Sequence, residues 1–425
     1  MMDRRRFLAG SAGAAGVVPL AGEAVAADPV RAPAASSGAP DVAVIGAGTF
    51  GGWTALCLRE KGAKVLSIDS YGPASPRASS AGETRSIRSG YGDEGFYADW
   101  SKKALALWKL REKEFGRQLF YPTDRIEMAQ TWSPHLTAQR RVFDDQKIPY
   151  EILTQSDLKA RWPQMNYDDV EFAFYETPAT AGLLRARESL LLTSQVFQKK
   201  GGRFEIGRAR PGAARGRVLG DVTLEDGTSV AAGQFVFACG PWSPQVFPKE
   251  MGRKVTVRRS EYYYWGVPAG DERFSWSGQP IWHDEIWGGY GFPSIERGLK
   301  YSPSRAPSAT PRPGVDINPD TMVRLPDPER LAYGAKYIAH RFPDMHDAPI
   351  VESRVCQFES TRDENFIIDR HPDYDNVWFA SGGGGHGYKF GPLLGDYISD
   401  RVLARTADPA FDSRFSWAGR PDRAS

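Results

Sequence analysis

Cysteine is scarce in this chain: its 425 residues include only three, Cys57, Cys239 and Cys356. A small, odd set of this kind excludes the disulfide framework that holds small secreted domains together. Cys57 falls in an apolar helical pattern and Cys239 in an apolar strand, so we predict that both are packed core residues. Cys356 has no comparable packing role, which sets it apart from the other two.

Excess charge and long apolar runs are also missing. The formal net charge is +2, too close to neutral for the basic surface that nucleic acid or an anionic membrane requires. The apolar run from Ala9 to Leu20 is too short, and too rich in glycine and alanine, to cross a bilayer. We therefore expect no nucleic-acid partner and no stable membrane insertion, and we predict no metal site.

The composition that remains is that of a large globular protein. Hydrophobic residues make up 41% of the chain and charged residues 25%, which excludes a disordered or fibrous chain. A length of 425 residues favours two lobes or one large α/β domain. The 12 Trp, 17 Tyr and 22 Phe suit an ordinary core, and they also suit a pocket for a flat cofactor or an apolar substrate.

The N-terminus has the order of a targeting signal. Residues 3–8, Asp-Arg-Arg-Arg-Phe-Leu, precede the apolar run, and the small residues 24–26, Ala-Val-Ala, form a cleavage site. The arginine pair resembles a twin-arginine signal; the alternative is a disordered basic N-terminus. We predict a signal peptide over 1–26, a flexible linker over 27–40, export by the twin-arginine machinery, and a periplasmic or extracellular location. That route moves folded proteins and therefore suits one that is loaded with a large cofactor in the cytoplasm.

The chain beyond the linker opens with a βαβ pattern. A short apolar run over 41–45 predicts a buried parallel strand, residues 53–61 a helix, and residues 64–68 a second strand. A glycine-rich turn joins the first strand to the helix. This arrangement is the context in which such a turn binds phosphate groups.

The glycine-rich turn itself has the pattern G-x-G-x-x-G. Gly46 allows the tight turn, Gly48 lets the backbone approach a pyrophosphate, and Gly51 lets the helix pack closely on the strand. Asp69 ends the second strand, where an acid accepts hydrogen bonds from a ribose. The pattern predicts dinucleotide binding, although a glycine-rich turn in an unliganded α/β fold is the alternative, and it does not separate FAD from NAD.

Two distant segments favour FAD. No second G-x-G-x-x-G opens another nucleotide domain, and the strand predicted over 234–239 ends in Ala-Cys-Gly240. Near the C-terminus, residues 381–389 contain a glycine run, including Gly385 and Gly387, before a predicted helix over 392–403. Backbone N–H groups without side chains can approach a ring system and a ribityl chain closely.

At these residues the chain resembles a known family. The resemblance is to monomeric sarcosine oxidase and N-methyltryptophan oxidase, within the D-amino-acid-oxidase-like flavoproteins. The segments that look like these proteins are residues 82–88, 290–294, 298–300 and 356–390. The resemblance runs in the same order from about residue 41 to about residue 405. It implies an α/β fold with a Rossmann-like FAD-binding lobe and an antiparallel-sheet substrate lobe.

The resemblance also implies roles for cofactor-binding residues. Cys356 matches the cysteine that carries FAD through a thioether to the flavin 8-methyl carbon; a small buried hydrophobic residue is its alternative reading. Arg85, which follows Thr84 in the same motif, matches an arginine packed against the flavin ring. Gly385, Gly387 and Lys389 belong to the segment that lines the cofactor.

Other residues match the substrate site. Arg88 and Lys389 match the pair that clamps the substrate carboxylate. Lys300 matches a lysine near the reactive flavin nitrogen, where a positive charge stabilises superoxide as oxygen is reduced. Tyr290 and His386 match pocket residues. Outside these motifs each would be read as a surface or core side chain.

The chain departs from the family pattern at a few positions. Ser80 and Ala81 stand where the family has a histidine pair, and Phe358 stands where it has a tyrosine. Ser304 stands where it has a pocket histidine, across a short deletion. These differences affect the substrate and the ease of flavin attachment more than the cofactor itself.

Together these features predict an FAD-dependent oxidase of a carboxylate-bearing secondary amine, such as an N-methyl or cyclic amino acid, with oxygen as acceptor and hydrogen peroxide as product. A dehydrogenase that passes electrons to a quinone or a carrier protein stays open, as does a binding module without turnover. The predicted division of the chain is an FAD-binding lobe over 41–120, 180–255 and 350–405, a substrate lobe over 121–179 and 256–349, and a C-terminal tail over 406–425.

Overall fold

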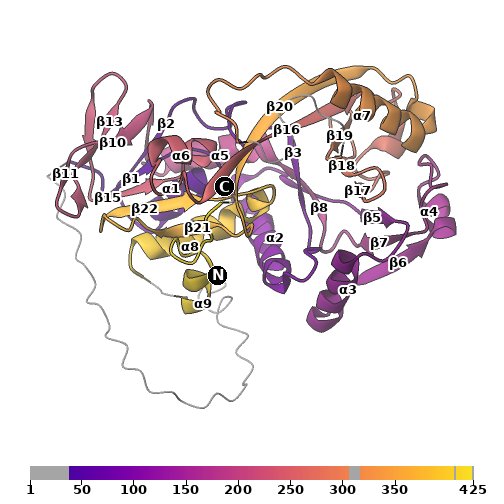
Figure 1. Ribbon diagram of the computed structural model, residues 1–425, viewed down its shortest axis with the longest axis horizontal. Coiled ribbons are helices and arrows are strands. Elements are labelled where there is room, and N and C mark those ends of the chain that lie inside the picture. The colour runs from indigo at the N-terminus through magenta and orange to yellow at the C-terminus, as the bar shows by residue number, and fades with distance from the viewer. Residues whose placement is uncertain (1–37, 306–315, 406–407, 424–425) are drawn as a thin grey trace, which may run out of the picture. The chain divides into compact units, whose positions relative to one another are not determined.

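The computed structural model describes residues 38–305, 316–405 and 408–423 (Figure 1). The predicted signal peptide lies outside these residues, as does the predicted linker up to residue 37. No helix within the described ranges is long and apolar enough to span a membrane, and no group of three or more His, Cys, Asp or Glu side chains there could hold a metal ion.

The helices are α1 (Thr49–Glu60), α2 (Gly95–Phe115), α3 (Pro134–Gln146), α4 (Gln155–Arg161), α5 (Ala186–Lys199), α6 (Ser243–Val246), α7 (Pro328–Arg341), α8 (Gly391–Val402) and α9 (Pro409–Arg414). Short 3₁₀ helices are η2 (Gly240–Trp242), η3 (Glu272–Phe274), η4 (Pro343–Met345) and η5 (Gly387–Phe390).

A six-stranded sheet contains the predicted βαβ unit. Its order is β21-β22-β15-β1-β2-β9, and every neighbouring pair is parallel except β21 and β22. The predicted strands and their helix are confirmed, although α1 begins before residue 53 because helical geometry already starts within the glycine turn. The strands are β1 (Val42–Ile45), β2 (Val65–Asp69), β9 (Arg203–Ile206), β15 (Gln234–Phe237), β21 (Ile367–Arg370) and β22 (Val377–Ser381).

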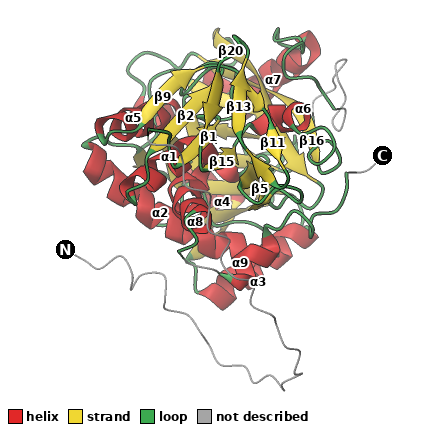
Figure 2. Ribbon diagram, turned by 90° about the vertical axis from the view of Figure 1, so that its left-hand side faces the viewer, coloured by secondary structure: helices red, strands yellow, loops and turns green. Residues whose placement is uncertain are grey.

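Both faces of this sheet are buried. Val42 belongs to the core cluster that contains Trp53 of α1 and Ile398 of α8. The next residue, Ala43, belongs to a second cluster with Phe235 on the other face. Successive side chains of a strand point to opposite faces, so a strand covered on both sides needs the continuous apolar run seen in the sequence. Figure 2 shows α1, α2, α5 and α8 grouped beside these strands.

An eight-stranded sheet forms the second lobe. Its order is β20-β16-β19-β18-β17-β5-β7-β6, and its neighbours are antiparallel except for β17 and β5. The predicted fold class, α/β with a largely antiparallel second sheet, is confirmed. The strands are β5 (Arg125–Ala129), β6 (Tyr150–Thr154), β7 (Phe172–Glu176), β16 (Val255–Trp265), β17 (Ile281–Asp284), β18 (Gly289–Phe292), β19 (Leu299–Pro303) and β20 (Ile350–Thr361).

The long strand β20 connects the two lobes along the chain. It pairs with β16 from Val255 to Trp265, so residues 350–361 lie in the eight-stranded sheet. The predicted division assigns them to the FAD-binding lobe instead, because the sequence of a strand does not by itself determine which other strand it pairs with. The described residues also form three small sheets: β3 (Thr84–Ile87), β8 (Gly182–Arg185) and β4 (Phe120–Pro122); β10 (Ala209–Pro211), β13 (Asp221–Leu224) and β14 (Ser229–Ala231); β11 (Ala214–Arg215) and β12 (Val218–Leu219).

The described part of the predicted C-terminal tail packs against the first lobe. It contains α9, and the following residue, Phe415, is fully buried. Arg420 is 7% exposed and forms an ion pair of 2.6 Å with Asp363. These contacts come from aromatic and charged residues distant in sequence, which local periodicity does not reveal.

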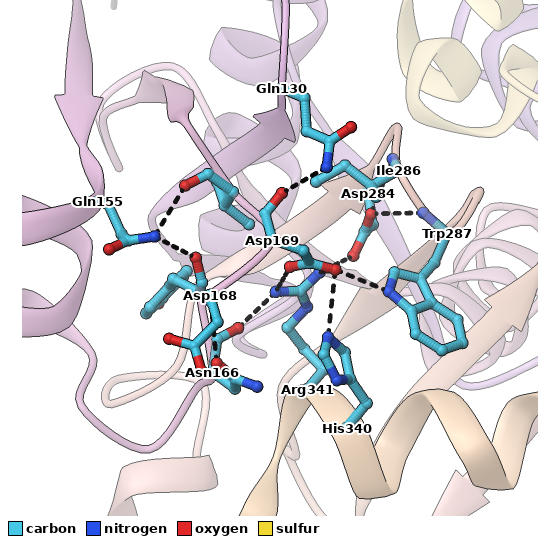
Figure 3. A network of polar contacts seen from close by, with 12 residues as sticks. Gln130, Gln155, Asn166, Asp168, Asp169, Asp284, Ile286, Trp287, His340 and Arg341 are labelled. Atoms are coloured by element: carbon cyan, nitrogen blue, oxygen red, sulfur yellow. Dashed lines mark hydrogen bonds and ion pairs between the residues drawn. The ribbon is translucent and has the colours of Figure 1, made fainter.

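A network of buried ion pairs and hydrogen bonds lies in the second lobe (Figure 3). Arg341, at the end of α7, is fully buried and lies 2.9 Å from Asp169 and 2.8 Å from Asp284. Asp284 also accepts a hydrogen bond from the Tyr337 hydroxyl at 3.0 Å. The indole N–H of Trp287 donates to Asp169 at 2.9 Å. The network links α7, β17 and the loop before β7.

Candidate functional site

A large cavity lies where the carboxyl edge of the six-stranded sheet meets one face of the eight-stranded sheet. Its volume is about 720 Å³, within the range of small-molecule and cofactor sites. The described residues lining it come from both sheets, from the glycine-rich turn and from the glycine segment near the C-terminus.

The glycine-rich turn forms one wall of the cavity. Gly46 has a φ of +103°, and a Cβ at this position would lie 2.3 Å from the carbonyl oxygen of Ala238. A Cβ at Gly51 would lie 1.9 Å from the oxygen of Gly46. Gly48 is different, since a Cβ there would approach only the Ser80 hydroxyl, at 3.3 Å. Side chains are thus kept out where α1 begins, and the turn fits a pyrophosphate at the helix N-terminus.

Asp69 lies at the end of β2 beside this turn. Its carboxylate accepts the backbone N–H of Ala47 at 2.7 Å and those of Tyr71 and Gly72 at 2.8 Å. Burial raises the pKa of Asp69, and these hydrogen bonds oppose the rise. The residue lines the cavity where we predicted a ribose acceptor, and it also holds the turn to the strand.

The second glycine segment lies between β22 and α8 and packs against Phe50 of the glycine-rich turn. Gly385 has no atom within 4 Å of an added Cβ, and a Cβ at Gly387 would meet the ring of Phe50 at 3.0 Å. The N–H of Gly383 donates to Glu359 of β20 at 3.2 Å. Burial raises the pKa of Glu359 to about 7, so this carboxyl group is largely protonated in weakly acidic solution. Glu359 lines the cavity and was not predicted from the sequence.

The predicted carboxylate clamp comes together at the cavity wall. Arg88 and Lys389 both line the cavity and lie against the same aromatic ring, with the guanidinium carbon of Arg88 4.4 Å from the centroid of Tyr91. The Lys389 ammonium donates to the Tyr91 hydroxyl at 2.7 Å and to the carbonyl of His386 at 3.1 Å. Burial, and then the charge of Arg88, hold the pKa of Lys389 well below its usual value. An anion between the two cations would reverse this effect.

Lys300 is placed differently from the clamp. It is 2% exposed on β19, and its ammonium donates to the carbonyl of Thr84 at 3.1 Å. The ring centroids of Tyr262 and Phe292, which both line the cavity, lie 4.3 and 4.6 Å from its nitrogen. Burial, and then the charge of Arg85, hold the pKa of Lys300 well below its usual value.

Arg85 and Cys356 lie on the same side of the cavity. Arg85 donates to the carbonyls of Thr84 and Ser79 at 2.9 Å each, which fixes the guanidinium in one orientation. The Cys356 sulfur lies 3.9 Å from the Ser79 carbonyl oxygen. Burial raises the pKa of the Cys356 thiol, and the charges of Arg85 and Lys300 oppose the rise. Cys356 is a free thiol at the cavity wall.

The two predicted pocket residues also line the cavity. Tyr290 lies on β18, and His386 packs against Tyr97 with ring centroids 4.8 Å apart. Burial lowers the pKa of His386 to about 3, so the imidazole is neutral near pH 7. Of the positions that depart from the family pattern, Ser80, Phe358 and Ser304 line the cavity, and Ala81 is buried beside it.

The two remaining cysteines are free thiols. Cys57 is buried in α1, as predicted. Cys239 also touches the core, but it is only partly buried and lines the cavity. Cys239 is therefore only partly a packed core residue, because the end of the strand on which it lies faces the cavity.

Several polar side chains of the cavity were not predicted: Arg125, Glu127 and His283 lie on neighbouring strands of the eight-stranded sheet. Tyr91, whose ring contacts both clamp residues, was not predicted either. The signal available in the sequence was the alternation Arg-Ile-Glu over 125–127, which places two charged side chains on one face of a strand.

Comparisons with known proteins agree with this site. A family model described as FAD dependent oxidoreductase matches residues 41–401. The monomeric sarcosine oxidase of Streptomyces avermitilis is 30% identical, over 88% of this chain and 97% of that protein. The N-methyl-L-tryptophan oxidase of Salmonella dublin is 25% identical, over 88% of this chain and 99% of that protein. The structure of L-proline dehydrogenase from P. horikoshii superposes with a TM-score of 0.76 at 18% identity, over 89% of this chain and 97% of that one, and shows the fold alone.

The predicted resemblance to the sarcosine oxidase and N-methyltryptophan oxidase group is confirmed by these similarities. The matched region includes both large sheets and the glycine segments that line the cavity. The chain therefore belongs to the family of FAD-dependent oxidoreductases.

Proposed function

We propose that the protein oxidises a carboxylate-bearing secondary amine, an N-methyl or cyclic amino acid, and that oxygen is the electron acceptor. One observation carries this proposal. Arg88 and Lys389 face the same cavity, and among the described residues neither forms an ion pair with a carboxylate. Two unneutralised cations in a partly desolvated site are complementary to the carboxylate of an amino acid.

The chain's own residues would bind and orient this substrate. The clamp would hold the carboxylate, and Tyr290 and His386, which line the same cavity, would orient the amine. Neutral His386 adds no charge that would compete with the clamp. FAD, when bound, supplies the electron-acceptor chemistry for the C–H bond next to the amine nitrogen. The amine loses two electrons and two protons; water then hydrolyses the imine, and oxygen takes up the electrons and protons as hydrogen peroxide.

A dehydrogenase that passes electrons to a quinone or a carrier protein is the second candidate. It is favoured by the burial of Lys300, whose ammonium donates to the carbonyl of Thr84 and contacts two aromatic rings. The oxidase proposal requires that this charge act on oxygen across a short distance in a region of low dielectric constant.

Visible spectroscopy of the holoprotein tests the proposed function. N-methyl and cyclic amino acids should bleach the flavin under nitrogen, and air should restore the spectrum with one equivalent of peroxide. Bleaching without rapid recovery in air would support the dehydrogenase instead. No bleaching by any secondary amino acid would overturn the proposal and favour a binding module.

We further propose that FAD is attached covalently to Cys356. The free thiol faces the cavity; burial raises its pKa, and the nearby charges of Arg85 and Lys300 oppose that rise. The wild-type protein should keep its flavin after acid denaturation, whereas Cys356→Ser should lack a mass equal to one FAD. Intact-mass spectrometry measures this difference, and Cys239→Ser, which alters another thiol of the cavity, is the control. Release of all flavin from the wild type would disprove the linkage but not FAD binding.

Export by the twin-arginine route is likewise a proposal, and its signal lies outside the described residues. Arg4→Lys together with Arg5→Lys keeps the charge but removes the planar guanidinium groups that a receptor reads. Uncleaved precursor should then accumulate in the cytoplasm, as immunoblotting of cell fractions would show. Replacing Arg31 by lysine in the predicted linker is the control. Normal export of the double variant would contradict the proposed route.

A further inference from the structure

One face of the eight-stranded sheet arranges the cavity residues in a fixed order. Ser302, Tyr290, His283 and Glu127 are direct partners across β19, β18, β17 and β5, so their side chains lie in one row. Lys300 lies two residues from Ser302 and therefore on the same face.

The row extends away from the proposed flavin attachment. Cys356 of β20 lies two strands from Lys300 on one side, and His283 lies two strands from it on the other. At roughly 4.8 Å between neighbouring strands, Glu127 lies about 14 Å from Lys300 across the sheet. The far end of the cavity is therefore formed by Glu127 and its neighbours rather than by the flavin site.

This far end holds a buried carboxylate with two imidazoles. Glu127 is 2% exposed, and its Oε1 lies 3.1 Å from Nδ1 of His283 and 3.9 Å from Nε2 of His135. Its other oxygen accepts a hydrogen bond from Arg125 at 3.0 Å. Both histidines line the cavity and are partly exposed to it.

The charges of this group leave an excess of negative charge. Arg125 also forms an ion pair of 2.5 Å with Glu176, so one guanidinium is shared between two carboxylates. Despite burial, Arg125 and His283 hold the pKa of Glu127 well below its usual value, and it is ionised. Burial, and then the negative charge of Glu127, raise the pKa of the neighbouring Glu285. The nearby Arg305 donates to the backbone carbonyl of Glu285 at 2.7 Å rather than to its side chain.

We propose that Glu127, His283 and His135 form a second binding subsite, which selects amino-acid substrates whose side chain ends in a positive charge. The cavity is then dipolar, with cations at Arg88 and Lys389 for the carboxylate and an anionic end for the tail. This inference rests on the proposed function and names the substrate class within it. In the neutral tautomer that donates Nδ1–H to Glu127, His283 leaves its Nε2 lone pair for the incoming ammonium.

The alternative for this group is an ionic network that only holds β5, β7 and β17 together. Such networks perturb pKa values in the same way as binding sites do. Two features favour a subsite. The histidines face the cavity rather than the core, and no described cation besides Arg125 and the histidines forms an ion pair with Glu127.

Matched substrates test the proposal in the holoprotein. Nα-methyl-lysine and Nα-methyl-ornithine carry an ammonium tail, Nα-methyl-norleucine ends in a methyl group, and the 6-hydroxy derivative of the latter carries a hydroxyl. A charge-assisted hydrogen bond should raise kcat/KM for one ammonium tail about 10- to 100-fold over norleucine, with the hydroxyl between them. The effect should lie in KM and in the half-saturating concentration for flavin reduction.

A binding measurement without turnover provides a second test of the subsite. The holoprotein should bind 6-aminohexanoate more tightly than hexanoate, by a similar factor, when followed through the flavin spectrum or by calorimetry. Neither ligand carries an α-amine, so the comparison isolates the clamp and the tail.

Variants locate the preference. In Glu127→Gln the ratio of kcat/KM for the lysine and norleucine derivatives should fall towards one. If this variant does not fold because Arg125 loses a partner, Glu285→Gln should lower the ratio partially. Glu151→Gln, an exposed carboxylate on β6 with its own arginine partner, removes the same charge and should keep the wild-type ratio.

The outcomes separate two failures. Equal kcat/KM for charged and uncharged tails, or a ratio that survives both Glu127→Gln and Glu285→Gln, would overturn the subsite while the amine oxidase stands. If no amino acid of the series reduces the flavin, the proposed function itself fails and the subsite falls with it.

Discussion

Replacing Lys389 by methionine is expected to lower kcat/KM for the amine by roughly 30- to several thousand-fold, which corresponds to about 2–5 kcal/mol. Lys389 is 4% exposed, and within the described part of the chain its ammonium donates to the Tyr91 hydroxyl and to one carbonyl only. Removing it leaves Arg88 as the only cation of the clamp. The loss should appear in amine binding and in flavin reduction under nitrogen, as measured by stopped-flow absorbance.

Lys300→Met is the matched comparison, because it removes a second buried ammonium from the same region. If Lys300 acts on oxygen, this variant should reduce its flavin at nearly the wild-type rate and reoxidise slowly. Lys389→Met should show the reverse. Wild-type reoxidation in Lys300→Met would remove the main support for an oxidase and bring the dehydrogenase forward. Wild-type reduction in Lys389→Met would contradict the clamp.

The Arg341→Met variant is expected to lower the free energy of unfolding by about 3–5 kcal/mol. Methionine fills part of the space, but it leaves Asp284, which is fully buried, without its cation (Figure 3). Asp169 loses two contacts with the guanidinium at the same time. Breaking a buried pair costs more than a surface pair because the remaining carboxylate cannot regain its hydration. Urea unfolding followed by tryptophan fluorescence measures the change.

Arg161→Met is the control for this prediction. Arg161 forms an ion pair of 2.6 Å with Glu151, but both side chains are well exposed, at 38% and 49%. Its loss should cost less than about 1 kcal/mol. Equal destabilisation by the two variants would show that burial does not set the cost. Retained stability in Arg341→Met would mean that Asp284 takes up a proton or water enters the core.

The sequence alone was sufficient to predict those features whose backbone conformation and chemical groups both come from one short segment. The turn from Gly46 to Gly51 needs glycine because carbonyl groups lie where side chains would stand, and this requirement is visible in the residues themselves. The periodicity of the flanking strands and helix supplied its context. The motif around Arg88 and the stretch from Cys356 to Phe390 supplied the cofactor class in the same way.

The tertiary structure decided which distant side chains meet. Tyr91 contacts both Arg88 and Lys389, and its hydrogen bond with Lys389 connects residues that are 298 positions apart in the sequence. Lys300 was predicted near the flavin from its motif, and its burial against Tyr262 depends on how β16 and β19 pair. Such contacts are set by packing between segments, and local periodicity does not encode them.

Strand register decided the remaining part of the site. A charged pattern such as Arg-Ile-Glu over 125–127 indicates one face of a strand, but it does not say which strand lies beside it. Only the parallel pairing of β5 with β17 sets Glu127 opposite His283, and only the hairpin of β17 with β18 continues the row to Tyr290. The chain's residues therefore determined a flavin-dependent oxidoreductase, whereas the long-range pairing of the second sheet determined the shape and charge of its substrate cavity.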